Sequence, residues 1–251
     1  MEITWYGHSA FALESTGRRV LVDPFLNGNP VFESEGKGTV AEKFAAAIKG
    51  TTDIVITHGH SDHIGDALDI AAATDATVFC NWDLGQWLVN KWQGMGTGKA
   101  LNIEMMNAGG RIEHNGVSIR LVRADHSSGV WERGIFQTLG NANGVIINIP
   151  GAPVIYHMGD TDIFAGMGLI EELHQPDIVI VPIGDRFTMG PSTAALAVRR
   201  FFPRSKAVIP CHFRTFGALT GTAEEFKREL GPLGTHLLDL NTHEPVTFSI
   251  G

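Results

Sequence analysis

Two hydrophobic periods run along this chain, one typical of strands and the other typical of helices. Apolar and polar residues alternate around Val117, Ile119 and Leu121, which predicts a half-buried antiparallel strand over residues 113–123. Apolar residues recur at spacings of three and four within residues 83–92, which predicts a helix. The chain therefore combines both kinds of element.

The same criteria predict the other elements. Short apolar runs bounded by turn residues predict strands at 11–14, 19–22, 52–56, 77–80, 144–149, 153–156, 177–182 and 206–210. Helical composition and spacing predict helices at 41–49, 64–73, 163–174, 192–202 and 223–230. Each half of the chain has strands first and helices after, without a low-complexity linker between the halves. The pattern predicts an α/β fold, an αββα sandwich of two mixed sheets with helices on the outer faces, formed by a single domain over residues 1–251.

The composition of the chain argues against some classes of binding partner. The chain has 251 residues, of which 43% are hydrophobic, so a sizeable core can form. The net charge is −8 and no basic stretch is longer than a pair, which argues against a nucleic-acid partner. No uncharged apolar run approaches the ~18 residues of a membrane span, and the N-terminus lacks the features of a signal peptide. Cys80 and Cys211 adjoin or end apolar runs as buried thiols do, so we expect a cytoplasmic protein without membrane association.

The segment after the predicted strand 52–56 has an unusual composition. Three imidazoles and one carboxylate fall within six residues, and these groups are preferred ligands of Zn²⁺ and similar cations. Crowded imidazoles and a carboxylate need a charged partner to be stable when buried, so a structural role alone is a poor explanation. This loop predicts half of a metal site, formed by His58, His60, Asp62 and His63.

More candidate ligands follow strands later in the chain. His126, Asp160 and His212 each come directly after an apolar run, and His8 lies near the N-terminus. Polar residues just beyond the strands of one sheet emerge at the same edge, where a site can form. A lone histidine at a strand end is more often structural. We therefore assign no function to His114, His157, His174, His236 and His243.

These residues together resemble the metallo-β-lactamase superfamily, whose signature is a His-x-His-x-Asp-His loop followed by a His, an Asp and a His at successive strand ends. The match extends over essentially the whole chain. Shorter motifs resemble a family of small, mostly uncharacterised metal-dependent hydrolases akin to ascorbate-6-phosphate lactonases. These motifs are GHSAF at 7–11, DPF at 23–25, THGH at 57–60, HSS at 126–128, YHMGDT at 156–161 and FTMGP at 187–191.

The resemblance implies a ligand set and a reaction. His58, His60 and His126 would hold a first metal, Asp62, His63 and His212 a second, and Asp160 would bridge them. One or two divalent ions are expected, with Zn first and Mn or Fe as alternatives. The implied activity is hydrolysis of an ester, a lactone or a phosphoester by a metal-activated hydroxide, which Asp62 would hold in line.

Other residues are candidates for supporting roles. Asp23 would orient a ligating imidazole, or it is only a turn residue before proline. His8 would reach the metals, bind substrate or protonate a leaving group, and we count it with Asp62 as a catalytic candidate. Arg186 and Arg214 would grip an anionic substrate, or they are solvated surface charges. Thr188 of the FTMGP motif is a further substrate-binding candidate. The sequence departs from the family at Asp185 and at Phe213-Arg214, which leaves the substrate open.

Alternative functions differ in what they would require. A phosphodiesterase of the same superfamily would place its anion directly on the metals, and the sequence does not choose between it and a lactonase. A ribonuclease of the superfamily usually carries an RNA-gripping arm, for which the chain has neither an insertion nor a basic patch. A flavin-partnered diiron reductase places a Glu where His60 stands. A non-catalytic metal-bound module would also keep the ligands. We expect a small-molecule substrate, anionic as one option, and homo-oligomerisation stays open.

Overall fold

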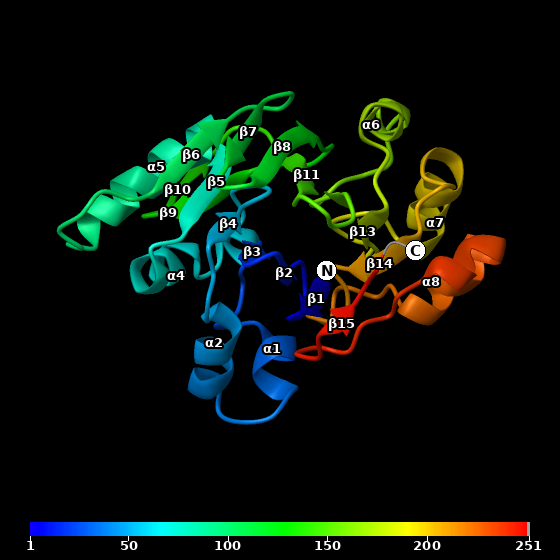
Figure 1. Cartoon of the computed structure of the whole chain (residues 1–251), viewed down its shortest axis with the longest axis horizontal. Helices are drawn as coiled ribbons and strands as arrows, with labels where there is room; N and C mark the ends of the chain where they lie inside the picture. The colour runs from blue at the N-terminus through cyan, green and yellow to red at the C-terminus, as the bar shows by residue number, and fades with distance from the viewer. Residues whose placement is uncertain (250–251) are drawn as a thin grey trace.

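The computed structural model describes residues 1–249, in which two mixed β-sheets pack face to face and helices lie along the outer flanks (Figure 1). In the first sheet, β15, β1, β2 and β3 are antiparallel neighbours, and β3, β4, β5 and β6 are parallel neighbours in that order. The bounds are β1 Glu2–Trp5, β2 Phe11–Ser15, β3 Arg18–Val22, β4 Asp53–Val55, β5 Thr77–Asn81, β6 Ile103–Met106 and β15 Val246–Thr247.

The second sheet repeats this mixture. Strands β7, β8, β11 and β12 are antiparallel neighbours, and β12, β13 and β14 are parallel. A separate two-stranded sheet, β9 with β10, follows β8. The bounds are β7 Arg111–His114, β8 Val117–Arg123, β9 Gly129–Glu132, β10 Ile135–Thr138, β11 Asn143–Asn148, β12 Ile155–His157, β13 Ile178–Pro182 and β14 Ala207–Cys211.

Within the described residues, α1, α2, α5 and α8 begin at a residue whose side chain caps the first turn. For example, Thr39 and Glu42 form a reciprocal capping box at the start of α2. Within residues 1–249, no helix has the length and apolar character needed to cross a membrane. The bounds are α1 Pro30–Ser34, α2 Val40–Ile48, α3 Ser61–Ile64, α4 Ala67–Thr74, α5 Trp82–Gly94, α6 Met167–His174, α7 Pro191–Phe201 and α8 Ala223–Leu230, with a 3₁₀ helix at Gly231–His236.

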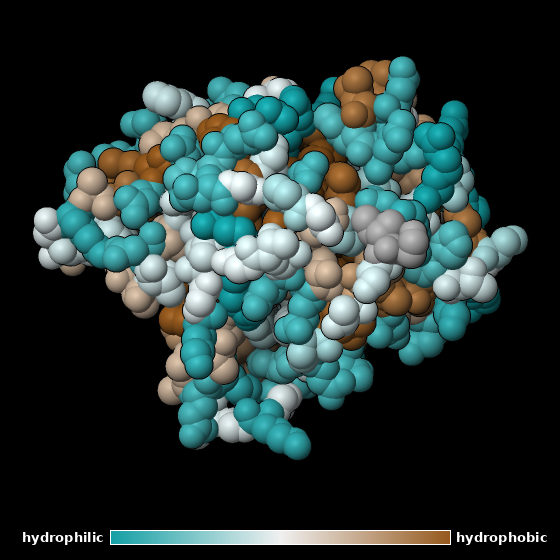
Figure 2. All heavy atoms as spheres, viewed as in Figure 1, coloured by the Kyte–Doolittle hydropathy of each residue, from teal (hydrophilic) through white to brown (hydrophobic). Residues whose placement is uncertain are grey.

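The period-two pattern of the strands separates two buried layers. Val22 of β3 pairs with Val55 of β4, and both side chains belong to the core shared with the second sheet. Leu21 and Ile54 pair one position earlier and belong to the layer under the helices of the first sheet. Because successive side chains point to opposite faces, each strand fills both layers. The face seen in Figure 2 is mostly hydrophilic, with hydrophobic residues in separate groups.

The predicted αββα sandwich of two mixed sheets with outer helices is confirmed. The strand predicted over 113–123 is confirmed from Val117 onward as β8, but its predicted start was wrong, because residues 111–114 form β7 and a hairpin joins the two strands. Asn115 and Gly116 form its two-residue turn with φ values of 47° and 84°, a conformation that Asn-Gly adopts readily. The short elements β6, β9, β10 and α1 were not predicted.

Helix α6 begins later than its predicted start at residue 163. The preceding residues are held outside a helix by the segment after β8. The Thr161 hydroxyl accepts a hydrogen bond from the Asp125 amide, and the Asp162 amide donates to the Asp125 carbonyl. These bonds fix the loop that follows Asp160, so the helix starts only at Met167.

Candidate metal centre

Polar side chains that follow strands of both sheets lie close together. The loop after β4 leads into the short helix α3, whose first turn carries Asp62 and His63. His126 follows β8, Asp160 follows β12, and His212 follows β14 directly. The structure thus brings the seven predicted ligands together, and His8, from the loop after β1, lies beside them.

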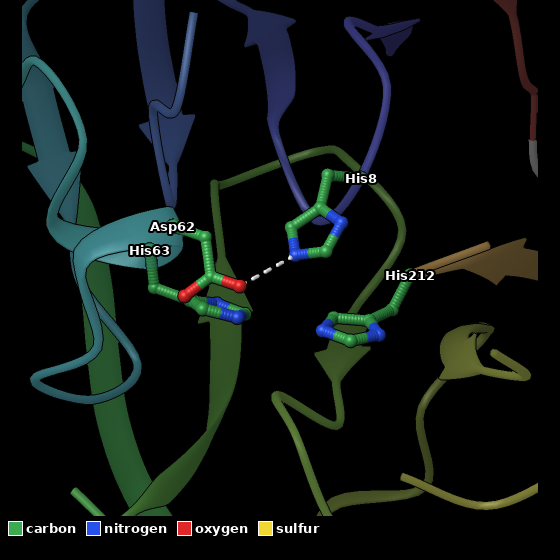
Figure 3. A group of neighbouring side chains, drawn as sticks. All are labelled: His8, Asp62, His63 and His212. Atoms are coloured by element: carbon green, nitrogen blue, oxygen red, sulfur yellow. Dashed lines mark hydrogen bonds and ion pairs between the residues drawn. The ribbon is translucent and has the colours of Figure 1, made fainter. Parts of the chain in front are cut away.

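The ligand atoms form overlapping sets, within each of which all atoms lie within 4.8 Å of one another. We call His58, His60 and His126 the first ligand cluster. We call Asp62, His63 and His212 the second ligand cluster, which Figure 3 shows together with His8. A further set joins Asp160 to His58 and His63.

Asp160 lies between the two clusters. Its Oδ2 atom is 3.0 Å from His212 Nε2, 3.3 Å from His63 Nε2 and 3.6 Å from His126 Nε2. Within the first cluster, His58 Nε2 and His60 Nδ1 are 2.9 Å apart. Tetrahedral coordination with Zn–N bonds near 2.0–2.1 Å places ligand atoms about 3.3 Å apart. The observed spacings therefore suit divalent cations.

Two buried polar atoms of the site support this fit. Within the described residues, His63 Nε2 and Asp160 Oδ1 have no hydrogen-bond partner. Buried polar atoms in native proteins nearly always have one. A cation bound between the clusters would satisfy both atoms, so the donor set fits the metal that the sequence predicts.

Asp23 orients two of the histidines. Its Oδ2 atom accepts from His63 Nδ1 at 2.7 Å and from the Thr57 hydroxyl at 2.7 Å, and its Oδ1 accepts from the Thr57 amide. Because the Thr57 hydroxyl donates to Asp23, its oxygen accepts from His58 Nδ1, 3.0 Å away. Both rings therefore turn their Nε2 atoms toward the centre, an arrangement typical of metal-ligating histidines.

The two clusters differ in their electrostatics. Burial, together with neighbouring imidazoles, lowers the pKa values of His58, His60 and His126, so the first cluster is neutral at pH 7. Burial also acts to lower the pKa of His63, but the carboxylates of Asp160 and Asp23 raise it well above its usual value. Burial acts to raise the pKa of Asp160, yet His212 and His63 hold it well below its usual range. The second cluster thus holds a proton that a cation would displace.

A cavity of about 300 Å³ opens beside the clusters. Its polar wall consists of ligand side chains and Ser127, and its apolar wall consists of Phe187 and Phe216. None of the described residues that line it is Lys or Arg. Its lining residues are His60, Asp62, His126, Ser127, Asp160, Phe187, His212 and Phe216.

The three predicted substrate-binding residues lie outside this lining. Arg214 forms an ion pair with Glu35 at 3.1 Å. Arg186 is exposed and lies over the ring of Phe187, 5.6 Å from its centroid. The Thr188 hydroxyl donates to the carbonyl of Met189. The substrate-binding roles of these three residues stay predictions.

His8 is fully buried and does not line the cavity. Its Nε2 is 3.1 Å from Asp62 Oδ2 and its Nδ1 is 3.0 Å from the Thr215 hydroxyl. Burial and the neighbouring His212 lower the pKa of His8 to about 4. The sequence alone assigns no role to Thr57, Thr215 or the two cavity phenylalanines. Thr57 adjoins the histidine loop, which could have drawn attention to it, whereas no sequence signal marks Thr215.

Comparisons with known proteins agree with this geometry. A family model described as a β-lactamase superfamily domain matches residues 2–212. A UPF0173 metal-dependent hydrolase of Methylobacterium nodulans is 48% identical over 238 residues, which cover 95% of each chain. Igni18, a metallo hydrolase from Ignicoccus hospitalis, is 32% identical, with a TM-score of 0.83 over 100% of this chain and 99% of that one.

A more distant structure shows the fold alone. The metallo-β-lactamase fold protein YhfI from Bacillus subtilis is 12% identical, with a TM-score of 0.66 over 96% of both chains. The full-length match to the first relative and the family model together settle the classification. The chain belongs to the metallo-β-lactamase superfamily and, within it, to the family of UPF0173 metal-dependent hydrolases.

Proposed function

We propose that this protein hydrolyses a small-molecule ester or lactone with the help of one or two divalent metal ions, Zn²⁺ first among them. The observation that carries the proposal is the convergence of two ligand clusters at the wall of one small cavity. A divalent cation bound there would supply a water molecule acidic enough to attack near neutral pH. The first cluster would hold one ion, the second cluster the other, and Asp160 would contact both.

The chain's own residues would then position the reactants. Asp62 is 30% exposed and lines the cavity, so its carboxylate can accept a hydrogen bond from the attacking water. Phe187 and Phe216 would hold the apolar part of the substrate and exclude bulk water. Asp23 and Thr57 would keep the ligating rings in their orientation while substrate binds.

The size and polarity of the cavity favour a small ester or lactone as the substrate. A volume of about 300 Å³ lies at the lower end of small-molecule pockets. Two phenylalanines and the absence of Lys or Arg among its described lining residues favour an ester or lactone with an apolar group. A phosphoester remains the second choice, because its anion would bind the cations directly. A ribonuclease is disfavoured, because a polynucleotide would need a longer and more basic surface.

The test is a metal analysis followed by a substrate panel. Freshly purified protein is analysed for metal and then assayed with Zn²⁺ or Mn²⁺ on aryl esters, apolar lactones, phosphorylated lactones and bis(p-nitrophenyl) phosphate. We expect bound metal, and the highest kcat/KM on an ester or lactone with an apolar group. Protein that holds no metal and gives no turnover with added metal would refute the proposal. A preference for the diester would move the assignment to the phosphodiesterase class.

A further inference from the structure

His8 is a buried histidine at the centre, and the ligand signature that this chain shares with the superfamily does not include it. Its backbone has a φ of 53°, which is uncommon for a residue other than glycine and fixes the ring beside the second ligand cluster. The ring is fully buried between Phe25 and Phe216, whose centroids lie 5.9 Å and 5.5 Å away. Because Phe216 lines the cavity and His8 does not, His8 has no access to a substrate's leaving group.

The hydrogen bonds of Thr215 define the tautomer of His8. The Thr215 hydroxyl donates to the carbonyl oxygen of Phe213 at 3.2 Å. Its oxygen can therefore only accept from His8 Nδ1, 3.0 Å away. In the neutral ring the Nε2 atom then carries a lone pair. Thr57 uses the same arrangement to orient His58, which is a predicted ligand.

The lone pair of His8 Nε2 lies close to hydrogen-bond acceptor atoms of neighbouring side chains. Asp62 Oδ2 is 3.1 Å away, and the ring of His212 is 4.0 Å away between centroids. Two acceptor atoms at this separation repel each other unless a positive charge lies near both. One potential ligand atom from each of His8, Asp62, His63 and His212 lies within 4.8 Å of the other three. Figure 3 shows these four side chains grouped together.

We propose that His8 is a further protein ligand at the second cluster, so that His8, Asp62, His63 and His212, with the shared Asp160, would close the coordination of one ion. Besides Asp160, the first cluster supplies three histidines and would keep a position for water. Sites closed by protein ligands are typical of structural zinc, and sites with an open position for water are typical of catalytic zinc. This inference rests on the proposed function and assigns separate roles within it. The residues of the second cluster would hold an ion that stabilises the site, and the residues of the first cluster would hold the ion that supplies the attacking water.

Thr215 is then a positioning residue for this ligand. Its hydroxyl fixes which nitrogen of His8 carries the proton, and residues with this role typically change metal affinity by about 10- to 100-fold when they are removed. Thr215 is itself buried and is not among the described residues that line the cavity, and its hydroxyl bonds His8 and the Phe213 carbonyl. Its substitution therefore tests the tautomer without removing any ligand atom.

The experiment compares metal binding in the full chain and its variants. His8→Asn removes the imidazole and keeps a residue that tolerates a positive φ. Thr215→Val removes the hydroxyl, and Thr215→Ser is its matched control. His243→Gln controls for loss of a histidine elsewhere, since His243 bonds the Phe32 carbonyl. The readouts are metal equivalents per chain after dialysis against a graded chelator, and the visible absorption spectrum with Co²⁺ as the probe metal.

We expect His8→Asn to lose one metal equivalent per chain and to change the Co²⁺ spectrum, while His243→Gln matches the wild type. We expect Thr215→Val to weaken one site by about 10- to 100-fold, and Thr215→Ser to stay near wild type. Wild-type metal content and spectrum in His8→Asn would overturn the proposal and leave a proton shared between His8 and Asp62. If His8→Asn does not fold, the comparison of Thr215→Val with Thr215→Ser tests the proposal instead. Equal metal affinities in these two variants would overturn it.

The outcome also separates this inference from the proposed function. Wild-type protein that binds metal and hydrolyses an ester, together with an unaltered His8→Asn variant, would refute only the role of His8. Wild-type protein that binds no metal at all would refute the proposed function, and the closed site with it.

Discussion

Asp23 is fully buried, and both of its carboxylate oxygens accept hydrogen bonds from residues of the candidate metal centre. It accepts from the ring of His63 and, through Thr57, sets the orientation of His58, so one residue reaches both clusters. The sequence left open whether Asp23 orients a ligand or only ends a strand before proline. Its φ of 44° is that of a turn residue, and its hydrogen bonds orient the rings of His63 and, through Thr57, His58. That these rings bind a metal stays a prediction.

Replacing Asp23 by Asn tests this coupling. The amide keeps the size of the carboxylate and tolerates the positive φ, but it weakens the acceptor for His63 Nδ1. We expect metal affinity to fall by about 10- to 100-fold, as measured by competition with a chromophoric chelator.

Asp53→Asn is the matched control for this variant. Asp53 is also fully buried, and it binds Arg18 at the far end of β4. It should lower stability without changing metal affinity. Equal metal affinities in Asp23→Asn and the wild type would show that the carboxylate is only a turn residue.

The opposite pKa shifts of the two clusters give a second prediction at this scale. The pKa of His63 is raised well above its usual value by Asp160 and Asp23 although burial opposes this, so the metal-free ring holds a proton at pH 7. A cation binding at the second cluster must release that proton, and its apparent affinity should rise by about tenfold per pH unit. The pKa values of the first cluster are lowered, so its affinity should be flat above pH 6.5.

Calorimetric titration in two buffers of different ionisation enthalpy counts the released protons. We expect about one proton per chain at pH 7 in the metal-free protein, from the step assigned to the second cluster. Release of no proton at pH 7 would contradict the raised pKa of His63.

At the scale of the elements, the turn between α3 and α4 fixes the helix that carries Asp62 and His63. Gly65 has a φ of 47°, and a Cβ atom there would lie 2.3 Å from the carbonyl oxygen of Pro24. The Asp66 amide donates to the same carbonyl, so this turn is pressed against the segment that follows Asp23. Only glycine fits such an approach without moving the backbone.

We expect Gly65→Ala to lower the free energy of unfolding by about 2–5 kcal/mol, because backbone strain and overpacking add. Gly50→Ala is the matched control, since Gly50 has a φ of 76° but nothing within 4 Å of its added Cβ. Gly50→Ala should lower the free energy of unfolding by only about 1–2 kcal/mol. Urea titration of the metal-free proteins measures both values, and equal losses would mean that the contact with Pro24 relaxes freely.

At the scale of the whole molecule, the sequence predicted the site where a polar candidate ligand directly follows the apolar run of a strand. The sequence reveals the histidine loop after a buried strand and three later candidate ligands, because each lies just beyond an apolar run. These candidates are His126, Asp160 and His212. The two-layer sandwich follows from the order of strands and helices in each half.

Other features depend on contacts that no local pattern reveals. Arg214 lies near His212 in sequence, but Glu35, which is distant in sequence, forms an ion pair with it. Thr215 matters only because the loop after β14 folds back on His8, and the cavity wall of Phe187 and Phe216 requires both loops in place. The hairpin of β9 and β10 was missed because its strands are short and β10 is exposed throughout.

The predicted ligands come from both halves of the sandwich, and this gives the last prediction. The histidine loop and α3 follow a strand of the first sheet, whereas His126, Asp160 and His212 follow strands of the second. A cation bound to both sets would hold the sheets together at this edge and would bind the folded chain only. The free energy of unfolding should therefore rise by about 2.7 kcal/mol at a free metal concentration of 100 times Kd, and by about 4.1 kcal/mol at 1,000 times Kd. Urea titrations in metal buffers measure this dependence. His126→Asn removes a second-sheet ligand from the first cluster, so its curve should be shallower, and a stability independent of free metal would refute the cross-link.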